Sequence, residues 1–459
     1  MKSKSRRKTN KPVRAEVSNF TDINPNAAGI DIGSGEHWVC VPTDRVKENV
    51  RRFGCFTPDL LEMAQWLVEC RVDTVAMEST GVYWIPAFQI LEAKGIEVQL
   101  VNAHYVKTVP GRKSDVLDCQ WLQQLHTYGL LSGSFRPDEQ VCVLRSYIRQ
   151  RDNLIKSSSA HVLRMQKALT QMNLQLHKVI SDITGVTGMA IIRAIVAGER
   201  NPQVLAANKN PRIRSSTTDI VKALTGDYRA EHIFVLKQEL QLYEIYQAQI
   251  ASCDVEIDKC LASFGCQENN LPPDPPKRGK RKPRGHEPAF DLRSHLYRIS
   301  GVDFTQIPGF DALTVQTLLS EVGLDATRFP TVKHFCSWLG LCPGSRITGG
   351  KIKSSQTRSV VNRAANAFRL AAQSLSRSQS ALGAFYRRLR TRLGAAKANT
   401  AAAHKLARIF YHLWSTKAAY ADSGADYYEQ KYRQRIVNKL EKTAHSLGFH
   451  LVAQHQESV

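Results

Sequence analysis

The sequence lacks the features that mark several large classes of protein. No apolar run reaches the roughly 18 residues of a membrane-spanning helix, so we expect no membrane segment. The 10 cysteines are scattered without a C-x-x-C pair, which argues against a zinc site and favours reduced thiols in a cytoplasm. The basic start of the chain has no apolar segment behind it and therefore does not resemble a secretory signal.

Acidic residues are absent from a long stretch towards the C-terminal end. The 96 residues between Asp325 and Asp422 contain no Asp or Glu, although they contain 17 Lys or Arg. The whole chain of 459 residues carries a formal net charge of +22. A solvated charged face normally mixes both signs, whereas an excess of one sign predicts a polyanionic partner. We therefore expect the chain to bind nucleic acid rather than a membrane surface.

What is present divides the chain into segments of different composition. Proline is missing between Pro137 and Pro202 and again between Pro211 and Pro272, which favours long helices. Four prolines and then six basic residues mark a linker. We expect a basic disordered tail (1–22), an α/β domain (23–137), a helical or coiled-coil region (138–270), the Pro-rich basic linker (271–289), a mostly helical domain (290–422) and a C-terminal helical tail (423–459).

The segment 23–137 alternates the patterns of strands and helices. Amphipathic helices are expected at Leu60–Val68 and Tyr83–Ala93. Strands are expected at Ala28–Ile32, His37–Val41, Thr74–Met77 and Glu97–Val101. Short strands that alternate with helices indicate an α/β layer fold.

Two acidic residues are associated with the expected strands. Asp31 lies inside the apolar run Gly-Ile-Asp-Ile-Gly, where the two-residue period of a strand places it on the face opposite Ile30 and Ile32. A carboxylate in such a place needs a hydrogen-bond partner, such as neighbouring backbone, or a metal ion. Glu78 follows the next expected strand, and an acid at a strand end is often merely exposed.

Two further acids share one face of an expected helix. Asp115 and Asp118 are three residues apart, so they either cap that helix or present two carboxylates together. Four carboxylates that converge in one small domain would repel one another unless cations bound among them. Two Mg²⁺ ions about 4 Å apart suit phosphodiester chemistry, since one activates the attacking oxygen and the other stabilises the leaving oxygen.

The four acids resemble the DEDD set of the RuvC-like transposases. They occur in the same order, within GIDIGS, MESTGVYW and KSDVLDCQWL. More specifically, the chain resembles insertion-sequence family one-ten, the bridge-RNA-guided serine recombinases, because IPGFDALTVQTLLSEVG, FCSWLGLCPGSRITGGK and NRAANAFRLAAQSL resemble that family's C-terminal domain. The resemblance covers most of residues 27–420. It implies an RNase H-like (RuvC-like) N-terminal domain, a long helical hairpin or coiled coil, and a mostly α-helical C-terminal transposase domain.

The resemblance also implies roles for single residues. The metal-binding catalytic acids of the family match Asp31, Glu78, Asp115 and Asp118, with Mg²⁺ as the expected ion. The family's nucleophilic serine, which precedes a glycine, falls on Thr348. Threonine has a hydroxyl that can attack a phosphate, but its β-methyl group crowds the approach. Either Thr348 is the nucleophile, or the role is lost or has moved to Ser345.

The loop around Thr348 and its flanks carry the residues expected to contact nucleic acid. The plainer interpretation of this loop is a glycine turn that only binds phosphate. The residues expected to contact nucleic acid are Lys113, Arg346, Gly349, Gly350, Lys351, Lys353, Arg358 and Arg363.

These implications predict a transposase of a bacterial insertion sequence that cuts and rejoins DNA through a covalent intermediate. Its expected partners are DNA, a structured guide RNA and further copies of the chain in a dimer to tetramer. Three alternatives stay open. A Holliday-junction nuclease would use the acids with water, and a non-catalytic relative would only bind nucleic acid. A sugar kinase or other actin-like ATPase would share GIDIGSGEH, but its later glycine motifs are not visible.

Overall fold

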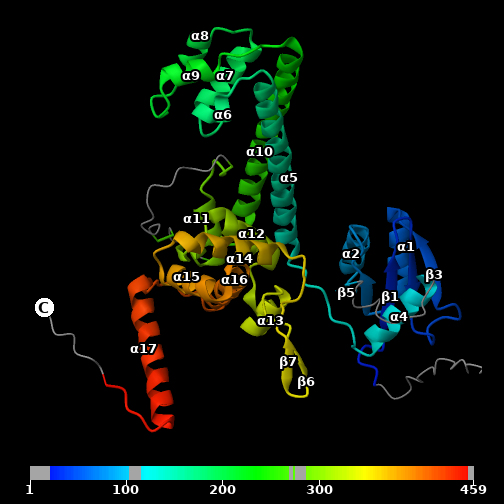
Figure 1. Ribbon diagram of the computed structural model, residues 1–459. Helices are drawn as coiled ribbons and strands as arrows, with labels where there is room; N and C mark the ends of the chain where they lie inside the picture. Colours follow the sequence, from blue (N-terminus) through cyan, green and yellow to red (C-terminus); the bar gives the residue numbers. More distant parts are fainter. Residues whose placement is uncertain (1–20, 103–114, 268–271, 274–285, 453–459) are drawn as a thin grey trace, which may run out of the picture. The chain divides into compact units, whose positions relative to one another are not determined.

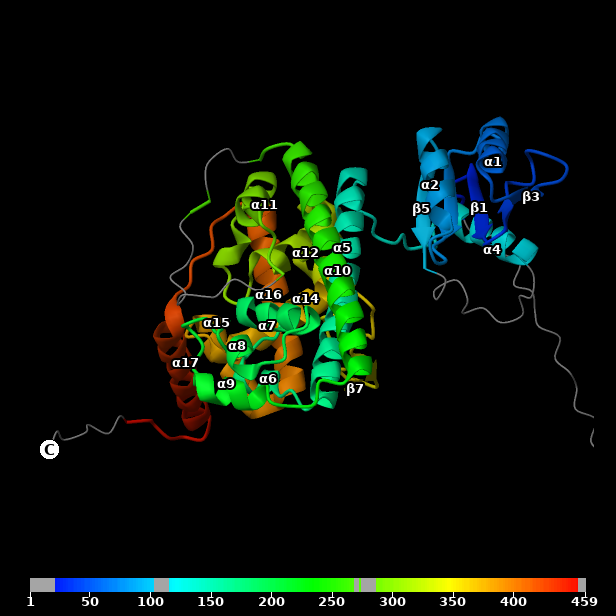
Figure 2. The ribbon, with the colours of Figure 1, turned by 90° about the horizontal axis from the view of Figure 1, so that it is seen from above.

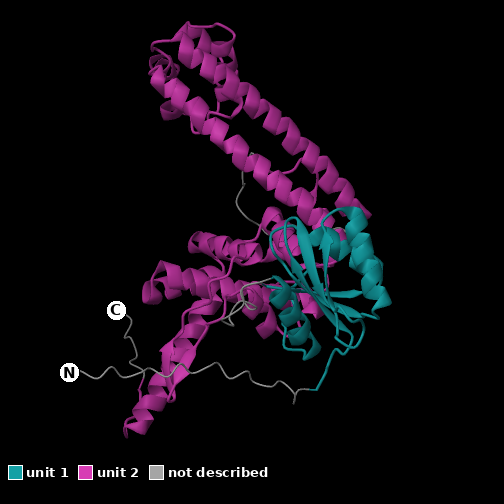
Figure 3. Cartoon of the chain, turned by 90° about the vertical axis from the view of Figure 1, so that its right-hand side faces the viewer, with its two compact units in different colours: residues 1–136 teal, residues 137–459 magenta. Residues whose placement is uncertain are grey.

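The computed structural model of the chain describes residues 21–102, 115–267, 272–273 and 286–452. It consists of two compact units, residues 1–136 and 137–459, which are coloured separately in Figure 3. The expected basic tail and the Pro-rich linker fall mostly outside the described residues. Within the described ranges, no helix is both long and apolar enough to cross a membrane.

The first unit is built on a mixed five-stranded sheet in the order β3-β2-β1-β4-β5. The strand β1 pairs antiparallel with β2 and parallel with β4. The strands are β1 (Ala27–Ile32), β2 (Glu36–Cys40), β3 (Val50–Gly54), β4 (Thr74–Glu78) and β5 (Glu97–Val101). The helices are α1 (Thr57–Glu69), α2 (Trp84–Ala93) and α4 (Asp115–Thr127). This arrangement confirms an α/β layer fold and is compatible with an RNase H-like fold.

The two faces of the sheet are covered by different helices. Alternate residues of β1, Ile30 and Ile32, are buried in a core that also contains Leu60 and Met63 of α1 and Leu91 of α2. The other face of the sheet is covered by α4, as the packing around β1 described below shows. Period two therefore sends the apolar residues of β1 to α1 and α2, and its intervening residues towards α4.

The second unit is helical and begins with two long helices, α5 (Glu139–Gln171) and α10 (Ala230–Ser263). They lie side by side in Figures 1 and 2. The nearly buried Arg151 of α5 binds Asp254 of α10 at 2.5 Å, and His161 Nδ1 lies 2.6 Å from Glu239 Oε2. Four short helices share an apolar core with the ends of α5 and α10 that lie beside them: α6 (Leu176–Val179), α7 (Val186–Val196), α8 (Pro202–Ala206) and α9 (Thr217–Ala223).

The remainder of the second unit packs around buried aromatic side chains. Phe304, Phe310, Phe335, Phe368 and Trp414 all contact Phe410 at ring-centroid distances between 4.4 and 6.5 Å. The elements are α11 (Leu292–Ser300), η1 (Phe304–Gln306), α12 (Ala312–Val322), η2 (Ala326–Arg328), α13 (Val332–Trp338), β6 (Arg346–Thr348), β7 (Lys351–Ser354), α14 (Arg363–Ser374), η3 (Leu375–Arg377), α15 (Ala381–Leu393), α16 (Ala395–Thr416) and α17 (Gly424–Ser446).

Arginines of α5 attach the long α5–α10 hairpin to α12, in the helical remainder of the second unit. Arg145 Nε donates to the carbonyl of Ser320 at 2.9 Å, close to the C-terminal end of α12. Arg149 donates to both carboxylate oxygens of Glu321, at 2.9 and 3.0 Å. Cations at the C-terminal end of a helix also interact favourably with its dipole, so these contacts fix the direction in which the hairpin leaves α12.

Candidate functional site

Two of the acids lie next to each other on neighbouring parallel strands. The register pairs Ile30 of β1 with Met77 of β4. The residues that follow, Asp31 and Glu78, therefore occupy equivalent positions near the carboxyl ends of the two strands and point to the same face of the sheet. Glu78 is buried, with 5% of its surface exposed, and Asp31 is half-buried.

The helix α4 brings the other two acids to the same end of that face. It runs antiparallel to β1, because the carbonyl of Thr127 accepts from Ile23 at 2.9 Å and Gln123 Nε2 donates to the carbonyl of Ala27 at 3.3 Å. Its first turn, with Asp115 and Asp118, therefore lies towards the end of β1 where Asp31 is found.

The electrostatics of a cysteine in α4 are consistent with this position of the helix near Asp31. A hydrogen bond with the Cys40 side chain, burial and then the negative charge of Asp31 all raise the pKa of the Cys119 thiol. Cys119 follows Asp118 directly in α4. Asp31, Glu78 and the first turn of α4 therefore gather at one end of the sheet.

The gathering does not amount to a formed ligand set. Asp115 is exposed and Asp118 is half-buried. Across the described ranges, no three His, Cys, Asp or Glu side chains lie close enough together to hold a metal ion. Carboxylate oxygens are nevertheless the donors that hard divalent cations prefer, so the chemistry of the four side chains fits such an ion. Lys113, which precedes α4, lies outside the described residues.

Gly29 is the residue that lets α4 approach the strand. A β-carbon at this position would lie 2.3 Å from both the Cys119 carbonyl oxygen and the Gln123 backbone nitrogen. Neither backbone atom can move without shifting the helix that carries Asp115 and Asp118. The absence of a side chain at Gly29 is thus a condition for placing those acids.

We predict that Gly29→Ala destabilises the first unit by about 1–3 kcal/mol, the usual cost of overpacking a tight contact. The reason is the clash with the backbone of α4, which would displace that helix. Urea denaturation followed by circular dichroism measures the change in the free energy of unfolding. Gly35→Ala is the matched control, because a β-carbon there meets no atom within 4 Å. Equal stability of the two variants would contradict the assigned role of Gly29.

Thr348 lies in the second unit, at the tip of an exposed two-stranded hairpin. It ends β6 and pairs with Lys351, the first residue of β7. The two residues between them, Gly349 and Gly350, have φ values of +55° and +73°, as a two-residue hairpin turn of type I′ requires. Thr348 is exposed, and so are Arg346, Lys351 and Lys353 of the same hairpin. The hairpin therefore presents a hydroxyl beside cationic side chains.

The basic residues that follow the hairpin are partly occupied within the fold. Arg358 Nη2 donates to the Ser337 carbonyl at 2.7 Å, and Arg363 lies 3.6 Å from Asp152 of α5. Both side chains remain exposed. Of the 17 basic residues in the acid-free stretch, three pair with carboxylates among the described residues: Arg328, Arg363 and Arg388. Most of the positive charge is therefore available to an anionic partner.

One feature of the second unit escaped the reasoning from sequence. Both α15 (AFYRRLRTRL) and α17 (DYYEQKYRQR) contain aromatic residues close to basic ones, and together with α16 these helices line a large pocket. Basic residues interleaved with aromatic ones are a pattern typical of nucleic-acid binding, so this signal was present in the sequence.

Comparison with protein families gives two matches in the order that the sequence predicts. Residues 28–174 match a DEDD transposase domain of IS110 type, and residues 303–387 match the transposase IS116/IS110/IS902 family. The first match contains the four acids, and the second contains Thr348. No curated protein matches the chain.

Both matched domains carry general implications for chemistry. Transposase domains cut and rejoin DNA and therefore bind it, and the DEDD designation implies the use of divalent metal ions in general. The acid arrangement at the end of β1 and β4 is consistent with both. The chain accordingly belongs to the IS110 family of transposases, insertion-sequence family one-ten.

Proposed function

We propose that the chain is an RNA-guided recombinase that moves an insertion sequence. In this proposal the Thr348 hydroxyl is the nucleophile that cuts the DNA, which is then rejoined. The observation that carries the proposal is the in-register placement of Asp31 and Glu78 on parallel strands beneath the acidic first turn of α4. Four carboxylates in that arrangement fit Mg²⁺, which prefers oxygen ligands. We infer an RNase H-like fold for this unit.

The acids would hold Mg²⁺, one or two ions, between the sheet and α4. When bound, the metal supplies Lewis-acid stabilisation of negative charge on the phosphate and on the leaving oxygen. The backbone that carries Asp31 and Glu78 is the more rigid, since both residues lie on paired strands. Asp115 and Asp118 lie in the first turn of a helix. We propose that the strand pair positions the site and the helix completes it when DNA binds.

In the first step, the Thr348 hydroxyl oxygen attacks the phosphorus of a DNA strand. A bond between threonine oxygen and phosphorus forms, the bond from phosphorus to the 3′ oxygen breaks, and the proton lost by threonine is balanced by the one that the 3′ hydroxyl gains. Gly349 and Gly350 allow the backbone to come close to the phosphate. Arg346 and Lys351 offset its negative charge. A 3′ hydroxyl of another strand then attacks the phosphothreonine and restores the free side chain.

Charge and family membership support the partners that we propose. The net charge of +22 and the acid-free stretch suit binding of both DNA and a structured guide RNA. We propose that copies of the chain assemble as a dimer to tetramer in which the acids of one protomer meet the threonine of another. The long α5–α10 hairpin is the element we assign to this contact. We propose that the protein acts in the cytoplasm, at the nucleoid. We also propose that its domains span residues 23–137, 138–270, 290–422 and 423–459.

Strand exchange with purified components tests the proposal. The protein, with the RNA that co-purifies from cells carrying the whole element, is mixed with a DNA that joins the two element ends and with a target DNA. We expect joined recombinant DNA in Mg²⁺ and none in EDTA, and sequencing of the bound RNA should return one species from the element's flank. Nicked DNA without joined product would instead favour the water-using nuclease.

A further inference from the structure

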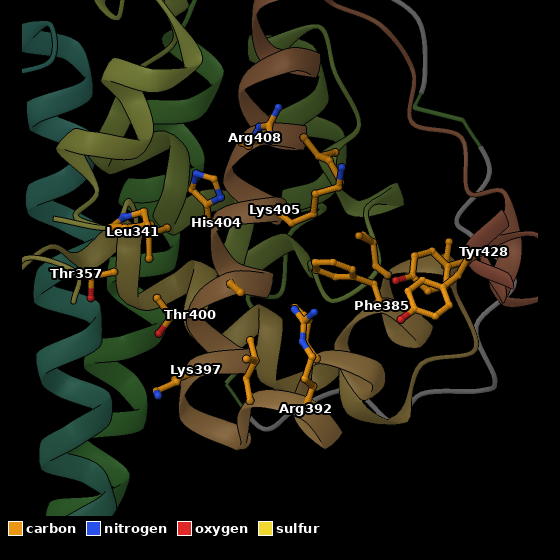
Figure 4. Close-up of a pocket in the computed structure, with 18 of the residues that line it drawn as sticks. Leu341, Thr357, Phe385, Arg392, Lys397, Thr400, His404, Lys405, Arg408 and Tyr428 are labelled. Carbon is orange, nitrogen blue, oxygen red and sulfur yellow. The ribbon is translucent and has the colours of Figure 1, made fainter. Parts of the chain in front are cut away.

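The second unit contains a pocket of about 1550 Å³ that the proposed chemistry does not use. Helices α15, α16 and α17 form most of its wall, and residues 354–357, which begin with the last residue of β7, form another part of it (Figure 4). Small-molecule sites usually enclose about 300–1,000 Å³, so this space suits a segment of a polymer better than a compact metabolite.

The lining of the pocket is strongly basic. Among the described residues of the lining, Asp422 is the only acid, and it already accepts hydrogen bonds from the backbone of Ala381 and Gly424, at 3.2 and 3.3 Å. No ion pair to a carboxylate is found for the basic side chains of the lining within the described residues. These side chains are Arg392, Lys397, Lys405, Arg408, Lys431 and Arg435. The pocket therefore contains positive charge that nothing in the described fold neutralises.

The basic side chains also repel one another. Burial, and then the charges of Arg408 and Arg435, lower the pKa of Lys405. Burial, Arg408 and Lys405 lower the pKa of the neighbouring His404. A bound anion would relieve this repulsion, and phosphate groups are the anions a DNA-binding protein meets most often.

Aromatic rings lie at one end of the same pocket. Phe385 of α15 and Tyr428 of α17 meet edge to face, with ring centroids 6.2 Å apart, and Figure 4 shows the two rings together. Tyr432 stacks on Tyr428 with a centroid distance of 6.4 Å. All three rings line the pocket and are only partly buried. The Arg388 guanidinium covers the Tyr432 ring, 3.4 Å from the ring centroid. Phe385 and Tyr428 can therefore offer ring surface to a base that is not already stacked in a duplex.

The position of the pocket relates it to the hairpin of Thr348. Its lining includes Pro343, three residues before β6, and Ser354, the last residue of β7. A strand held in the pocket would thus pass the base of the hairpin whose tip carries the hydroxyl. Holding an unpaired strand there would restrict the movement of the phosphate to be attacked.

We propose that this pocket binds an unpaired stretch of nucleic acid, with phosphates at Arg392, Lys405 and Arg408 and a base stacked on Phe385 and Tyr428. The inference rests on the proposed function and adds the form of nucleic acid that this part of the chain recognises. Basic side chains alone would bind a duplex equally well. Accessible aromatic rings, in contrast, can stack only on bases that are not paired and stacked within a duplex.

Fluorescence anisotropy with labelled oligonucleotides tests the proposal. Their length is about 12 nucleotides, which is within the usual range for single-strand sites. Single-stranded DNA, single-stranded RNA and duplex DNA are compared in EDTA. For Arg392→Gln with Lys405→Gln we expect at least tenfold weaker binding of a single strand and a salt slope smaller by about 1.4, from the loss of two phosphate contacts. For Tyr428→Leu we expect about fivefold to tenfold weaker single-strand binding and little change for duplex.

Each variant has a control on the same helix or with the same change of charge. Arg390→Gln with Lys439→Gln removes two charges outside the pocket lining, and Tyr427→Leu removes an exposed ring next to Tyr428 in sequence. Both controls should bind as the unaltered protein does. Thermal unfolding shows whether Tyr428→Leu still folds. If it does not, the charge variant, which alters no side chain of the apolar core, decides the matter.

The outcomes separate this inference from the proposed function. If the pocket variants lose binding of single-stranded DNA or of single-stranded RNA, the result supports the pocket and identifies which nucleic acid it binds. Equal losses for duplex and single strand, or losses no greater than those of the controls, would overturn it. Because the assay contains no divalent metal and no strand exchange, it measures the pocket without the chemistry assigned to the acids of the first unit. If the unaltered protein failed to exchange strands but its pocket variants still lost single-strand binding, the result would count against the proposed function alone.

Discussion

Strand exchange is expected to fall by about a thousandfold or more when Asp31 or Asp118 is replaced by alanine, because a metal ligand stabilises the transition state by several kcal/mol. Each substitution removes a carboxylate from the end of the sheet where β1, β4 and α4 meet. Mg²⁺ binding, followed by calorimetry, should weaken in parallel. Both side chains are only half-buried, so circular dichroism should show an intact fold.

The control for this prediction is Asp44→Ala. The Asp44 side chain is 71% exposed, and it forms an ion pair with the neighbouring Arg45 at 3.4 Å. Its loss removes the same charge from the first unit without touching the acid cluster, so recombination should be unchanged. Full recombination by Asp31→Ala or by Asp118→Ala would remove the basis for a metal site at this position.

The second large effect concerns Thr348. Thr348→Ala should abolish both cleavage and joining, because the attacking oxygen is gone. Thr348→Ser should keep or raise activity, because it retains the oxygen and removes the methyl group that crowds the approach. The side chain is exposed at the tip of a hairpin, so neither change should alter the stability of the fold. A gel assay on a labelled DNA substrate measures both activities.

Ser345 provides the comparison within the same loop. It is exposed and lies three residues before Thr348, just outside β6. Ser345→Ala should recombine normally if Thr348 is the nucleophile. Normal activity of Thr348→Ala together with an inactive Ser345→Ala would transfer the role to the serine.

The regular parts of the first unit could be predicted because their side chains follow clear periods. The run Ala28–Ile32 alternates buried apolar residues with Gly29 and Asp31, and the structure places β1 there. The strand β3 was missed, because its residues Arg51 and Arg52 are charged and exposed. It forms at the edge of the sheet through backbone pairing with β2, which leaves little trace in a hydrophobic pattern.

The candidate sites could be predicted only as far as local sequence determines them. The position of Asp31 and Glu78 at the same end of the sheet follows from the two-residue period of strands and from the parallel pairing typical of an α/β fold. The approach of α4 at Gly29 depends on a contact between residues about 90 positions apart, which no local pattern shows. The pocket between α15, α16 and α17 depends likewise on how three helices pack, although the basic and aromatic residues of its wall are visible in the sequence.

Trapping the protein on DNA tests the central claim most directly. A suicide substrate, nicked so that the cleaved end diffuses away, prevents rejoining and preserves any covalent intermediate. The DNA-linked peptide is then isolated and sequenced by mass spectrometry. The account predicts a 5′-phosphothreonine at Thr348, formed in Mg²⁺ and absent from both Thr348→Ala and Asp31→Ala. Cleavage of the substrate with no DNA attached to the protein would contradict it.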